Sequence, residues 1–292
     1  MELRQLEYFV AVAEEANFTR AAARVHISQS GVSAQIKALE SELGQPLFDR
    51  SSRVARLTAA GKAALGPARA ALAATAAVRD AVDDVAGVLR GTLCIGMVTG
   101  CTITPLFAAV EAYRQVHPGV KLAMRENDSQ SMLAEIETGS LDLAIVGTAG
   151  APPATVESMT IISEPLAALV PAGHALAGRK RVDYATLVGE PLVSMPSGTG
   201  VRAALEIGCE QLGFAPLVAV EASAADAIAD LCARGVGIGV LSESMAREYT
   251  DRLSVVRLGG NPVPAVLAVV WSRTPSPAVR AFVPRLAAAF KK

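Results

Sequence analysis

The pattern of apolar residues changes near position 91, and this change limits the folds that the chain can adopt. Up to that point apolar residues recur at steps of three and four, the period of an amphipathic helix. Beyond it, short apolar runs alternate with helical segments, which is typical of α/β folds. A chain of 292 residues is long enough for two or three domains. The sequence therefore predicts an all-α N-terminal part followed by an α/β part.

Three short helices are predicted at the start of the chain. The first runs from Leu3 and ends near Asn17. The second is expected to begin at Thr19, whose hydroxyl would cap the free amides that follow it. The third follows Ser28 and ends at Gly44, a residue suited to a helix C-cap. The tight connection between the second and third helices makes this a helix-turn-helix unit.

A wing and a long helix are predicted next. Residues 46–58 carry arginines around a turn, which suits a two-stranded wing. From Thr58 to about Leu89 an alanine-rich segment predicts one helix, which Gly66-Pro67 should kink because proline lacks a backbone amide. We expect a second copy of this helix to cover its apolar stripe, which is close to a coiled-coil seam. The stripe consists of Leu65, Ala68, Leu72, Thr75, Val78, Val82, Val85 and Leu89.

Charge is unevenly distributed along the chain. The formal net charge is −1, from 27 basic and 28 acidic residues. Between Arg20 and Arg69, however, eight basic residues stand against three acidic ones, which leaves a net charge of +5. Such a segment in a nearly neutral chain is typical of a nucleic-acid-binding domain joined to an acidic partner domain. A solvated helical face would give the same count, and charge alone does not separate the two interpretations.

From residue 91 the order β-α-β-α-β predicts a parallel, doubly wound sheet, and a second set of elements begins around Ile161. The last strand and helix have no sheet of their own, so we expect them to return to the first lobe. Two lobes joined by two crossings imply a hinged cleft. The expected strands are 93–98, 120–126, 142–146, 167–170, 191–194, 218–221, 237–241 and 266–271. The expected helices are 102–117, 129–138, 182–187, 200–212, 224–233 and 277–290.

Several classes of protein are disfavoured by the sequence. The apolar runs are far shorter than the roughly 18 residues that span a bilayer, so no membrane segment is expected. The N-terminus lacks the basic lead and apolar core of a signal peptide, which predicts a cytoplasmic protein. Four cysteines and three histidines have neither zinc-ligand spacing nor a disulfide framework, so no metal or other cofactor is expected.

A long motif resembles the LysR-type transcriptional regulators. It comprises Leu3 to Phe9, Phe18-Thr19-Arg20-Ala21-Ala22, Ser28-Gln29-Ser30, Val32 to Glu40, Leu43-Gly44, Pro46 to Arg50 and Leu57 to Gly61. The C-terminal part is similar to the effector-binding domain of the same family. The matching runs there are Gly139 to Ile145, Gly173 to Ala177 and Gly235 to Ile238. The resemblance therefore extends over the whole chain.

The resemblance implies a multi-domain regulator. Its expected parts are an all-α winged helix-turn-helix DNA-binding domain (1–58), a long linker and dimerisation helix (59–89), and a two-lobed, periplasmic-binding-protein-like α/β effector domain (90–292). Lobe 1 would hold about 90–161 and 266–292, and lobe 2 about 162–265. A homodimer would bind a pseudo-palindromic operator in double-stranded DNA and assemble further into a tetramer, with RNA polymerase as another partner and no membrane partner. A small-molecule effector bound between the lobes would control this activity.

The resemblance also assigns residues to DNA contact. Gln29 would begin the recognition helix, where its amide can pair with adenine in the major groove. Ser30 and Ser33 lie one turn apart and suit phosphate or base contact. The plainer interpretation is an ordinary exposed side chain for Ser33, and a salt bridge to Asp49 or to a neighbouring helix for Arg50. The full set is Thr19, Gln29, Ser30, Ser33 and Lys37, with Arg50 and Arg53 from the wing.

Effector-binding candidates lie where helices begin near the expected cleft, because unpaired amides there attract carboxylates and polar oxygens. A serine or threonine before a helix is also a common N-cap, and this alternative stays open for each residue. No cluster of arginines or aromatic residues dominates these loops, which indicates a small polar or anionic co-inducer. The candidates are Thr99, Cys101, Thr102, Ser129, Thr148, Ser197, Gly198 and Thr199.

Three other functions fit parts of the sequence. An enzyme would use an α/β fold, but the glycine run Gly235 to Gly239 enters a strand, whereas a dinucleotide-binding loop leaves one. A periplasmic solute receptor would share the two-lobed shape, but the basic N-terminal unit argues against it. One branch of the resembled family senses peroxide through a cysteine pair in the second lobe, and Cys101 and Cys209 raise this function here. Cys209 and Cys232 lack that branch's short spacing, which disfavours it.

Overall fold

The computed structural model describes residues 1–49, 54–85, 89–99, 103–260 and 263–291. Contacts divide the chain into two units, Met1–Leu89 with Glu137–Ser140 and Arg90–Ile136 with Leu141–Lys292. Among the helices of the described ranges, none combines the length and the hydropathy needed to cross a bilayer.

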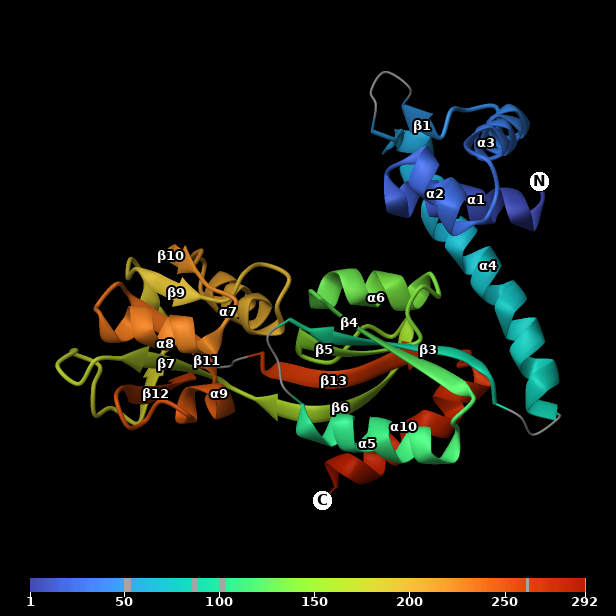
Figure 1. Cartoon of the computed structure of the whole chain (residues 1–292). Helices are drawn as coiled ribbons and strands as arrows, with labels where there is room; N and C mark the ends of the chain where they lie inside the picture. Colours follow the sequence, from blue (N-terminus) through green and yellow to red (C-terminus); the bar gives the residue numbers. More distant parts are fainter. Residues whose placement is uncertain (50–53, 86–88, 100–102, 261–262, 292) are drawn as a thin grey trace. The chain divides into compact units, whose positions relative to one another are not determined.

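The N-terminal unit is a bundle of three helices, followed by a short hairpin and a long helix (Figure 1). The two strands of the hairpin pair antiparallel and form the predicted wing. The elements are α1 (Leu3–Glu15), α2 (Phe18–Arg24), α3 (Gln29–Leu43), β1 (Phe48–Asp49), β2 (Arg56–Leu57) and α4 (Ala59–Val85).

Side-chain caps fix where these helices begin. The hydroxyl of Ser28 accepts a hydrogen bond from the amide of Gly31 and caps α3, which ends at Gly44 with a left-handed φ of 70°. The prediction that Thr19 caps α2 is wrong. Asn17 is the cap, because its side-chain Oδ1 accepts hydrogen bonds from the amides of both Thr19 and Arg20.

The hairpin is anchored to the helical bundle by an aromatic side chain. Phe48 is buried, and its ring meets those of Phe9 and Phe18 edge-on at centroid distances of 5.6 and 5.5 Å. The carboxylate of Glu40 on α3 accepts hydrogen bonds from the amides of Leu47 and Phe48. The core of the helices thus determines where the wing begins.

Helix α4 has two different surfaces along its length. Its first half packs on the bundle, where Leu65, Ala68 and Leu72 join the core of the N-terminal unit. These three residues of the predicted stripe therefore pack on the bundle of their own chain. The expectation that a second copy covers the stripe stays a prediction. Farther along, Val78 and Val82 are each 67% exposed. The helix continues through Pro67 and ends at Val85, and residues 86–88 of the predicted helix lie outside the described part.

The first lobe of the second unit is a five-stranded sheet in the order β4-β3-β5-β13-β6. Helices α5 and α10 pack together on one face, and α6 covers the other (Figure 1). Strand β13 pairs antiparallel with β5 and β6, so the chain returns to this lobe as the sequence predicts. The elements are β3 (Gly91–Val98), α5 (Thr104–Val116), β4 (Val120–Asn127), α6 (Ser129–Glu137), β5 (Leu143–Ala149), β6 (Val156–Glu164), β13 (Ala265–Ser272) and α10 (Pro277–Phe290).

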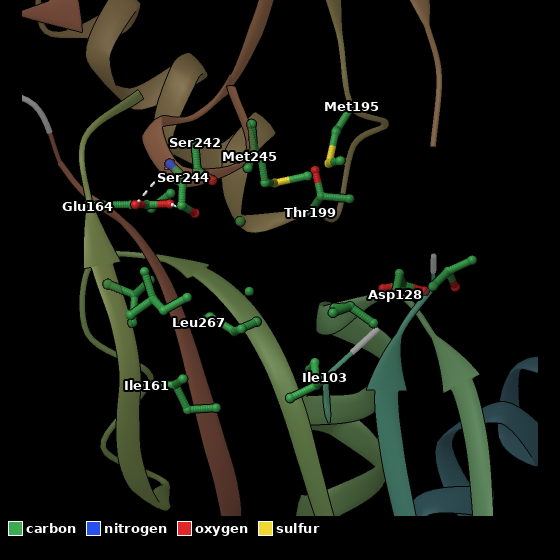
Figure 2. Close-up of a pocket in the computed structure, with 18 of the residues that line it drawn as sticks. Ile103, Asp128, Ile161, Glu164, Met195, Thr199, Ser242, Ser244, Met245 and Leu267 are labelled. Carbon is green, nitrogen blue, oxygen red and sulfur yellow. Dashed lines mark hydrogen bonds between the residues drawn. The ribbon is translucent and has the colours of Figure 1, made fainter. Parts of the chain in front are cut away.

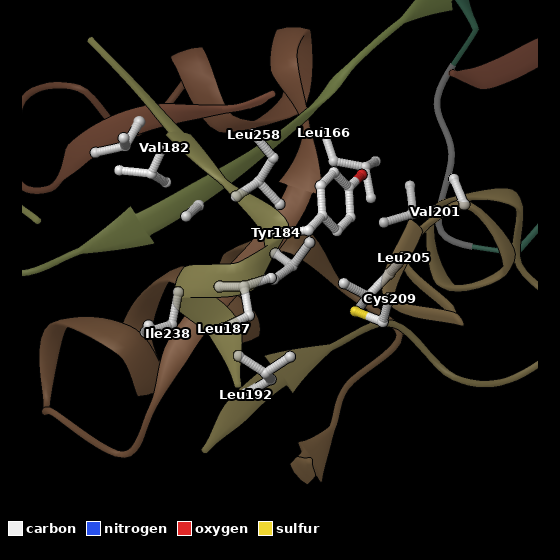
Figure 3. Packing of buried hydrophobic residues seen from close by; sticks show 14 of the residues in the cluster. Leu166, Val182, Tyr184, Leu187, Leu192, Val201, Leu205, Cys209, Ile238 and Leu258 are labelled. Atoms are coloured by element: carbon white, nitrogen blue, oxygen red, sulfur yellow. The ribbon is translucent and has the colours of Figure 1, made fainter. Parts of the chain in front are cut away.

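The second lobe is a six-stranded sheet in the order β10-β9-β11-β7-β12-β8. Central strand β7 is apolar throughout because it is buried on both faces: Leu166 packs on the side of Tyr184 and Leu205 (Figure 3), and Leu169 packs on the side of Ile228. The elements are β7 (Leu166–Val170), β8 (Arg181–Asp183), the 3-10 helix η1 (Tyr184–Leu187), β9 (Leu192–Ser194), α7 (Gly200–Glu210), β10 (Val218–Glu221), α8 (Ala225–Ala233), β11 (Ile238–Ser242), α9 (Glu243–Arg247) and β12 (Ser254–Gly259).

Three sequence expectations for the second unit need correction. Both sheets are mixed rather than wholly parallel, because β13 and β7 run antiparallel to their neighbours. The expected helix 182–187 is the end of β8 followed by η1. Strands β6 and β12 were not predicted, since their partly exposed residues mix apolar and polar side chains without a long apolar run.

The two lobes touch through a pair of glycines. Gly147 lies on β5 of the first lobe and Gly200 begins α7 of the second. A Cβ at position 200 would lie 2.4 Å from the backbone nitrogen of Thr148 and 2.5 Å from the carbonyl carbon of Gly147. The backbones can approach this closely only because residue 200 has no side chain. The backbones of the two lobes are therefore in contact beside the cavity described below.

Candidate functional site

The exposed face of α3 carries the side chains predicted to contact DNA. Gln29 is the first residue of this helix and is exposed, as are Ser30 and Lys37, while Ser33 is half-buried. The opposite face is buried in the core through Val32, Ile36 and Leu39. The helical period therefore separates a packed face from a polar face that is open to a partner.

The remaining DNA-contact candidates fall in two groups. Thr19 is exposed in the first turn of α2, where its amide is bound by the cap Asn17. The hydroxyl of Ser30 lies 3.1 Å from that of Ser28. Arg50 and Arg53 of the wing lie outside the described residues.

Part of the local positive charge is neutralised within the bundle. Arg24 of α2 lies 2.7 Å from Glu14, and Arg69 of α4 reaches the same carboxylate at 2.9 Å. Arg20 pairs with Glu15 at 3.4 Å. Both acids precede the basic segment in the sequence, so the count of +5 overstated the charge of this surface. Lys37, one of the predicted DNA contacts, is exposed on α3.

A cavity of about 700 Å³ lies between the two lobes of the second unit (Figure 2). Apolar side chains make up much of its lining, with several hydroxyl groups among them. From the first lobe the main lining residues are Val98, Thr99, Ile103, Thr104, Asn127, Asp128, Ile161, Ile162, Glu164, Val266 and Leu267. From the second lobe they are Met195, Ser197, Thr199, Val201, Ser223, Ser242, Ser244 and Met245.

The cavity brings together three of the predicted effector residues. Thr99, Ser197 and Thr199 line it. Thr199 is also the N-cap of α7, since its hydroxyl accepts a hydrogen bond from the amide of Arg202 at 3.3 Å. Both roles named for this residue type are thus compatible with its position.

The other predicted effector residues lie beside the cavity or cannot be placed. The hydroxyl of buried Ser129 accepts a hydrogen bond from the amide of Gly147, and that of Thr148 donates to the carbonyl oxygen of Gly150. Neither residue, nor Gly198, belongs to the lining as far as the described residues define it. Cys101 and Thr102 lie outside the described part of the chain.

Two acidic lining residues were missed by the sequence reasoning. Asp128 follows β4, and its carboxylate accepts hydrogen bonds from the amide and the hydroxyl of Ser131 at 2.8 and 2.6 Å. Those bonds lower the pKa of Asp128. Glu164 ends β6 and accepts hydrogen bonds from the amide and the hydroxyl of Ser244 at 3.1 and 2.6 Å. The signal that could have found both residues is their position at the carboxyl ends of strands, where cavities form in α/β folds.

The described cysteines of the second lobe are set for packing rather than thiol chemistry. Burial, followed by the nearby Glu206 carboxylate, raises the pKa of Cys209 to about 11. Burial also raises the pKa of Cys232, whose thiol donates to the carbonyl oxygen of Leu169. A thiol with a raised pKa is a poor nucleophile because little thiolate is present. Within the described ranges, no group of three or more histidine, cysteine or acidic residues could hold a metal ion.

Two family models match the chain. The model for bacterial regulatory helix-turn-helix proteins of the lysR family matches residues 3–62, and that for the LysR substrate binding domain matches residues 86–291. The chain is 34% identical over 255 residues to the transcriptional dual regulator GltC of Bacillus subtilis, covering 87% of this chain and 85% of that protein. It is 33% identical over 294 residues to the uncharacterized HTH-type transcriptional regulator YnfL of Escherichia coli, covering 97% and 96%.

Solved structures share the fold over the full length. A full-length OxyR variant from Pseudomonas aeruginosa has a TM-score of 0.71 at 27% identity, covering 100% of this chain and 98% of that one. CbnR, a LysR family transcriptional regulator, has a TM-score of 0.59 at 25% identity, with full coverage of both chains. CbnR in complex with its target DNA matches with a TM-score of 0.58 at 24% identity, covering 99% and 100%.

Proposed function

The chain belongs to the LysR family of bacterial transcriptional regulators, and we propose that it recognises its operator through the exposed face of α3. It is a DNA-binding regulator with an effector-binding domain, and its curated relatives are regulators of transcription rather than enzymes. The position of Gln29 carries the proposal about α3. An exposed amide at the first position of a helix whose other face is buried is well placed to enter a major groove.

The side chains around Gln29 have different proposed roles. Gln29 reads a base, because its amide offers one donor and one acceptor to adenine. Ser30, Ser33, Lys37 and Thr19 contact the sugar-phosphate backbone and fix the register of α3 on the duplex. Arg50 and Arg53 of the wing add charge along the flanking groove.

The regulator acts as a homodimer on a pseudo-palindromic operator. Support comes from Val78 and Val82 of α4, whose exposed apolar side chains form a surface that a second α4 would cover. We assign residues 1–58 to DNA binding, 59–89 to dimerisation, and 90–292 to effector binding. Pairs of dimers forming a tetramer, contact with RNA polymerase and a cytoplasmic location complete the proposal.

The small-molecule effector binds in the cavity between the lobes. Support comes from its volume of about 700 Å³, within the range of pockets for small molecules, and from its mixture of apolar walls and convergent hydroxyl groups. Thr99, Ser197 and Thr199 are its proposed polar contacts. The further candidates are Cys101 and Thr102, which follow Thr99 in the sequence, Gly198 between Ser197 and Thr199, Ser129 at the start of α6, and Thr148 on β5. Binding would change the spacing of the lobes and so the affinity of the dimer for its operator.

Footprinting on the promoter nearest the protein's own gene tests this function. The full-length protein should protect two half-sites one or more helical turns apart. Protection should weaken steeply as salt rises, because phosphate contacts release counterions. Sequence-independent binding at low salt, or a lack of protection, would contradict the proposal.

A further inference from the structure

The described charged residues that line the cavity between the lobes all have the same sign. Among the described residues that line it, two are charged, and both are acidic: Asp128 and Glu164. The same part of the chain contributes no lysine, arginine or histidine to the lining. A carboxylate ligand placed here would approach two negative groups and would be repelled by both.

Arg202, the basic residue nearest in sequence to the lining residues of α7, is already paired with acidic side chains. Arg202 lies just beyond the lining residues Thr199 to Val201. Its Nε donates to Glu206 at 2.7 Å and its Nη1 donates to Glu221 at 2.8 Å, and only 12% of its side chain is exposed. These two carboxylates hold the guanidinium group, so Arg202 does not offset the acidic lining.

Asp128 is placed to receive a ligand. Its hydrogen bonds with Ser131 stay within one turn of α6 and keep the carboxylate ionised, and each oxygen retains acceptor capacity. Opposite it lies Gly198 of the second lobe, with φ of +88°, where a Cβ would stand 3.4 Å from Oδ1. Such a Cβ would be in ordinary van der Waals contact with the carboxylate, so glycine places only backbone on this side of Asp128.

Unlike those of Asp128, the hydrogen bonds of Glu164 connect the two lobes. Its carboxylate binds the amide and the hydroxyl of Ser244 on α9, so it links the last strand before the crossing to the second lobe. A ligand that took these bonds would break a contact between the lobes. Asp128 can accept a ligand without that cost.

We propose that the cavity takes a ligand with an apolar body and a protonated amine, and that Asp128 binds the amine. This proposal rests on the assignment of the cavity as the effector site. The apolar body lies against Ile161, Leu267 and Ile103, which Figure 2 shows beside the cavity with Asp128 at one end and Glu164 at the other. The ammonium group donates a charge-assisted hydrogen bond to Asp128. The chemical class is therefore an aliphatic or aromatic amine rather than a carboxylate.

Calorimetric titration of the full-length protein with three probes tests this class. Phenylbutylamine, phenylbutanol and phenylbutyrate share one apolar body and differ in the charge of the terminal group. We expect the amine to bind about tenfold to a hundredfold more tightly than the alcohol, the range for hydrogen bonds to charged groups. The carboxylate should bind most weakly.

Two variants locate the charge that is responsible. Asp128→Asn should lower the affinity for phenylbutylamine to that for phenylbutanol, and should leave phenylbutanol binding unchanged. Asparagine is itself a good N-cap, so α6 is preserved. Glu164→Gln is the matched control and should keep the preference for the amine.

Three results would overturn the proposal. They are carboxylate binding as tight as amine binding, an equal loss of amine affinity in Glu164→Gln, and no binding of any of the three probes. None of these results changes the footprint of the protein on its promoter. A failure of the ligand class is therefore distinguishable from a failure of the proposed regulatory function.

Discussion

Nη2 of Arg69 donates a hydrogen bond of 2.9 Å to Oε1 of Glu14, which ties α4 to α1 across 55 residues of sequence. The other oxygen of the same carboxylate accepts a hydrogen bond from Arg24 of α2. One acidic side chain therefore joins three helices of the N-terminal unit. Because α4 carries the proposed dimer surface, this carboxylate ties the helix with that surface to α1 and α2.

The stability of the N-terminal unit should depend on the charge of Glu14. Burial alone would raise the pKa of Glu14, but hydrogen bonds from Arg24 and Arg69 outweigh burial and hold it below the usual 4.5. A carboxyl group with a lowered pKa stabilises the fold above its unfolded pKa, and this contribution is lost as pH falls through the folded pKa. Glu14→Gln should cost about 1 kcal/mol at pH 7. The difference from the unmodified protein should shrink as the pH falls below 4.5 and vanish once it is below the lowered pKa of Glu14.

Urea denaturation at a series of pH values measures this effect. Glu7→Gln, an exposed position on the same helix, is the control and should follow the unmodified protein throughout. If Glu14→Gln and the unmodified protein kept a constant difference from pH 7 to pH 3, the carboxylate would not be the group that responds to pH.

The start of α2 offers a second test. Asn17→Ala removes the side chain that binds two amides, and should lower the free energy of unfolding by about 1 kcal/mol. Thr19→Ala should change it by less than about 0.5 kcal/mol, because Thr19 is exposed and does not cap the helix. An equal decrease in the free energy of unfolding in the two variants would indicate that Thr19 also caps the helix.

The glycine contact between the lobes offers a third test. Gly200→Ala would place a Cβ against the backbone at Gly147 and Thr148, so the lobes must move apart or the variant must lose about 1 to 3 kcal/mol of stability. Gly173→Ala is the matched control, because a Cβ there meets nothing within 4 Å. Thermal unfolding of both variants, with phenylbutylamine binding as a second readout, should show an effect for Gly200→Ala alone. Unchanged unfolding and binding in that variant would mean that the close approach does not set the spacing of the lobes.

Local patterns predicted the elements that are defined by residues close together in the sequence. The apolar period of Val32, Ile36 and Leu39, together with Ser28 and Gly44, is enough to define α3, because caps and core faces depend on neighbours along the helix. The return of β13 to the first sheet was predicted because the last strand and helix have no sheet of their own.

Remote pairings could not be predicted in the same way. The neutralisation of Arg69 depends on Glu14 in another helix. The packing of Leu65 against the bundle of its own chain likewise depends on how α4 packs on α1. The sequence did not identify Asp128 as a cavity residue, because its position is typical of a helix cap. Only the fold brings it opposite Gly198.

The exposed part of the α4 stripe predicts a change in oligomeric state. The double variant Val78→Glu, Val82→Glu should convert the dimer into a monomer, because it places charges in an apolar contact while keeping a good helix former at each position. Ala70→Glu, which is exposed on α4 but lies outside the stripe, is the control and should remain dimeric. Sedimentation of the three proteins at the same concentration measures the difference. A double variant that sediments as the unmodified protein does would exclude this surface from the dimer.

In the proposed function Gln29 contacts a base of the operator, and footprinting of a single variant tests this contact. Gln29→Ala should lose protection of the operator while sedimenting as a dimer, since Gln29 is exposed and contributes nothing to the core. Gln211→Ala, an exposed glutamine of the second unit, should protect the operator as the unmodified protein does. Full protection by a dimeric Gln29→Ala variant would contradict the account.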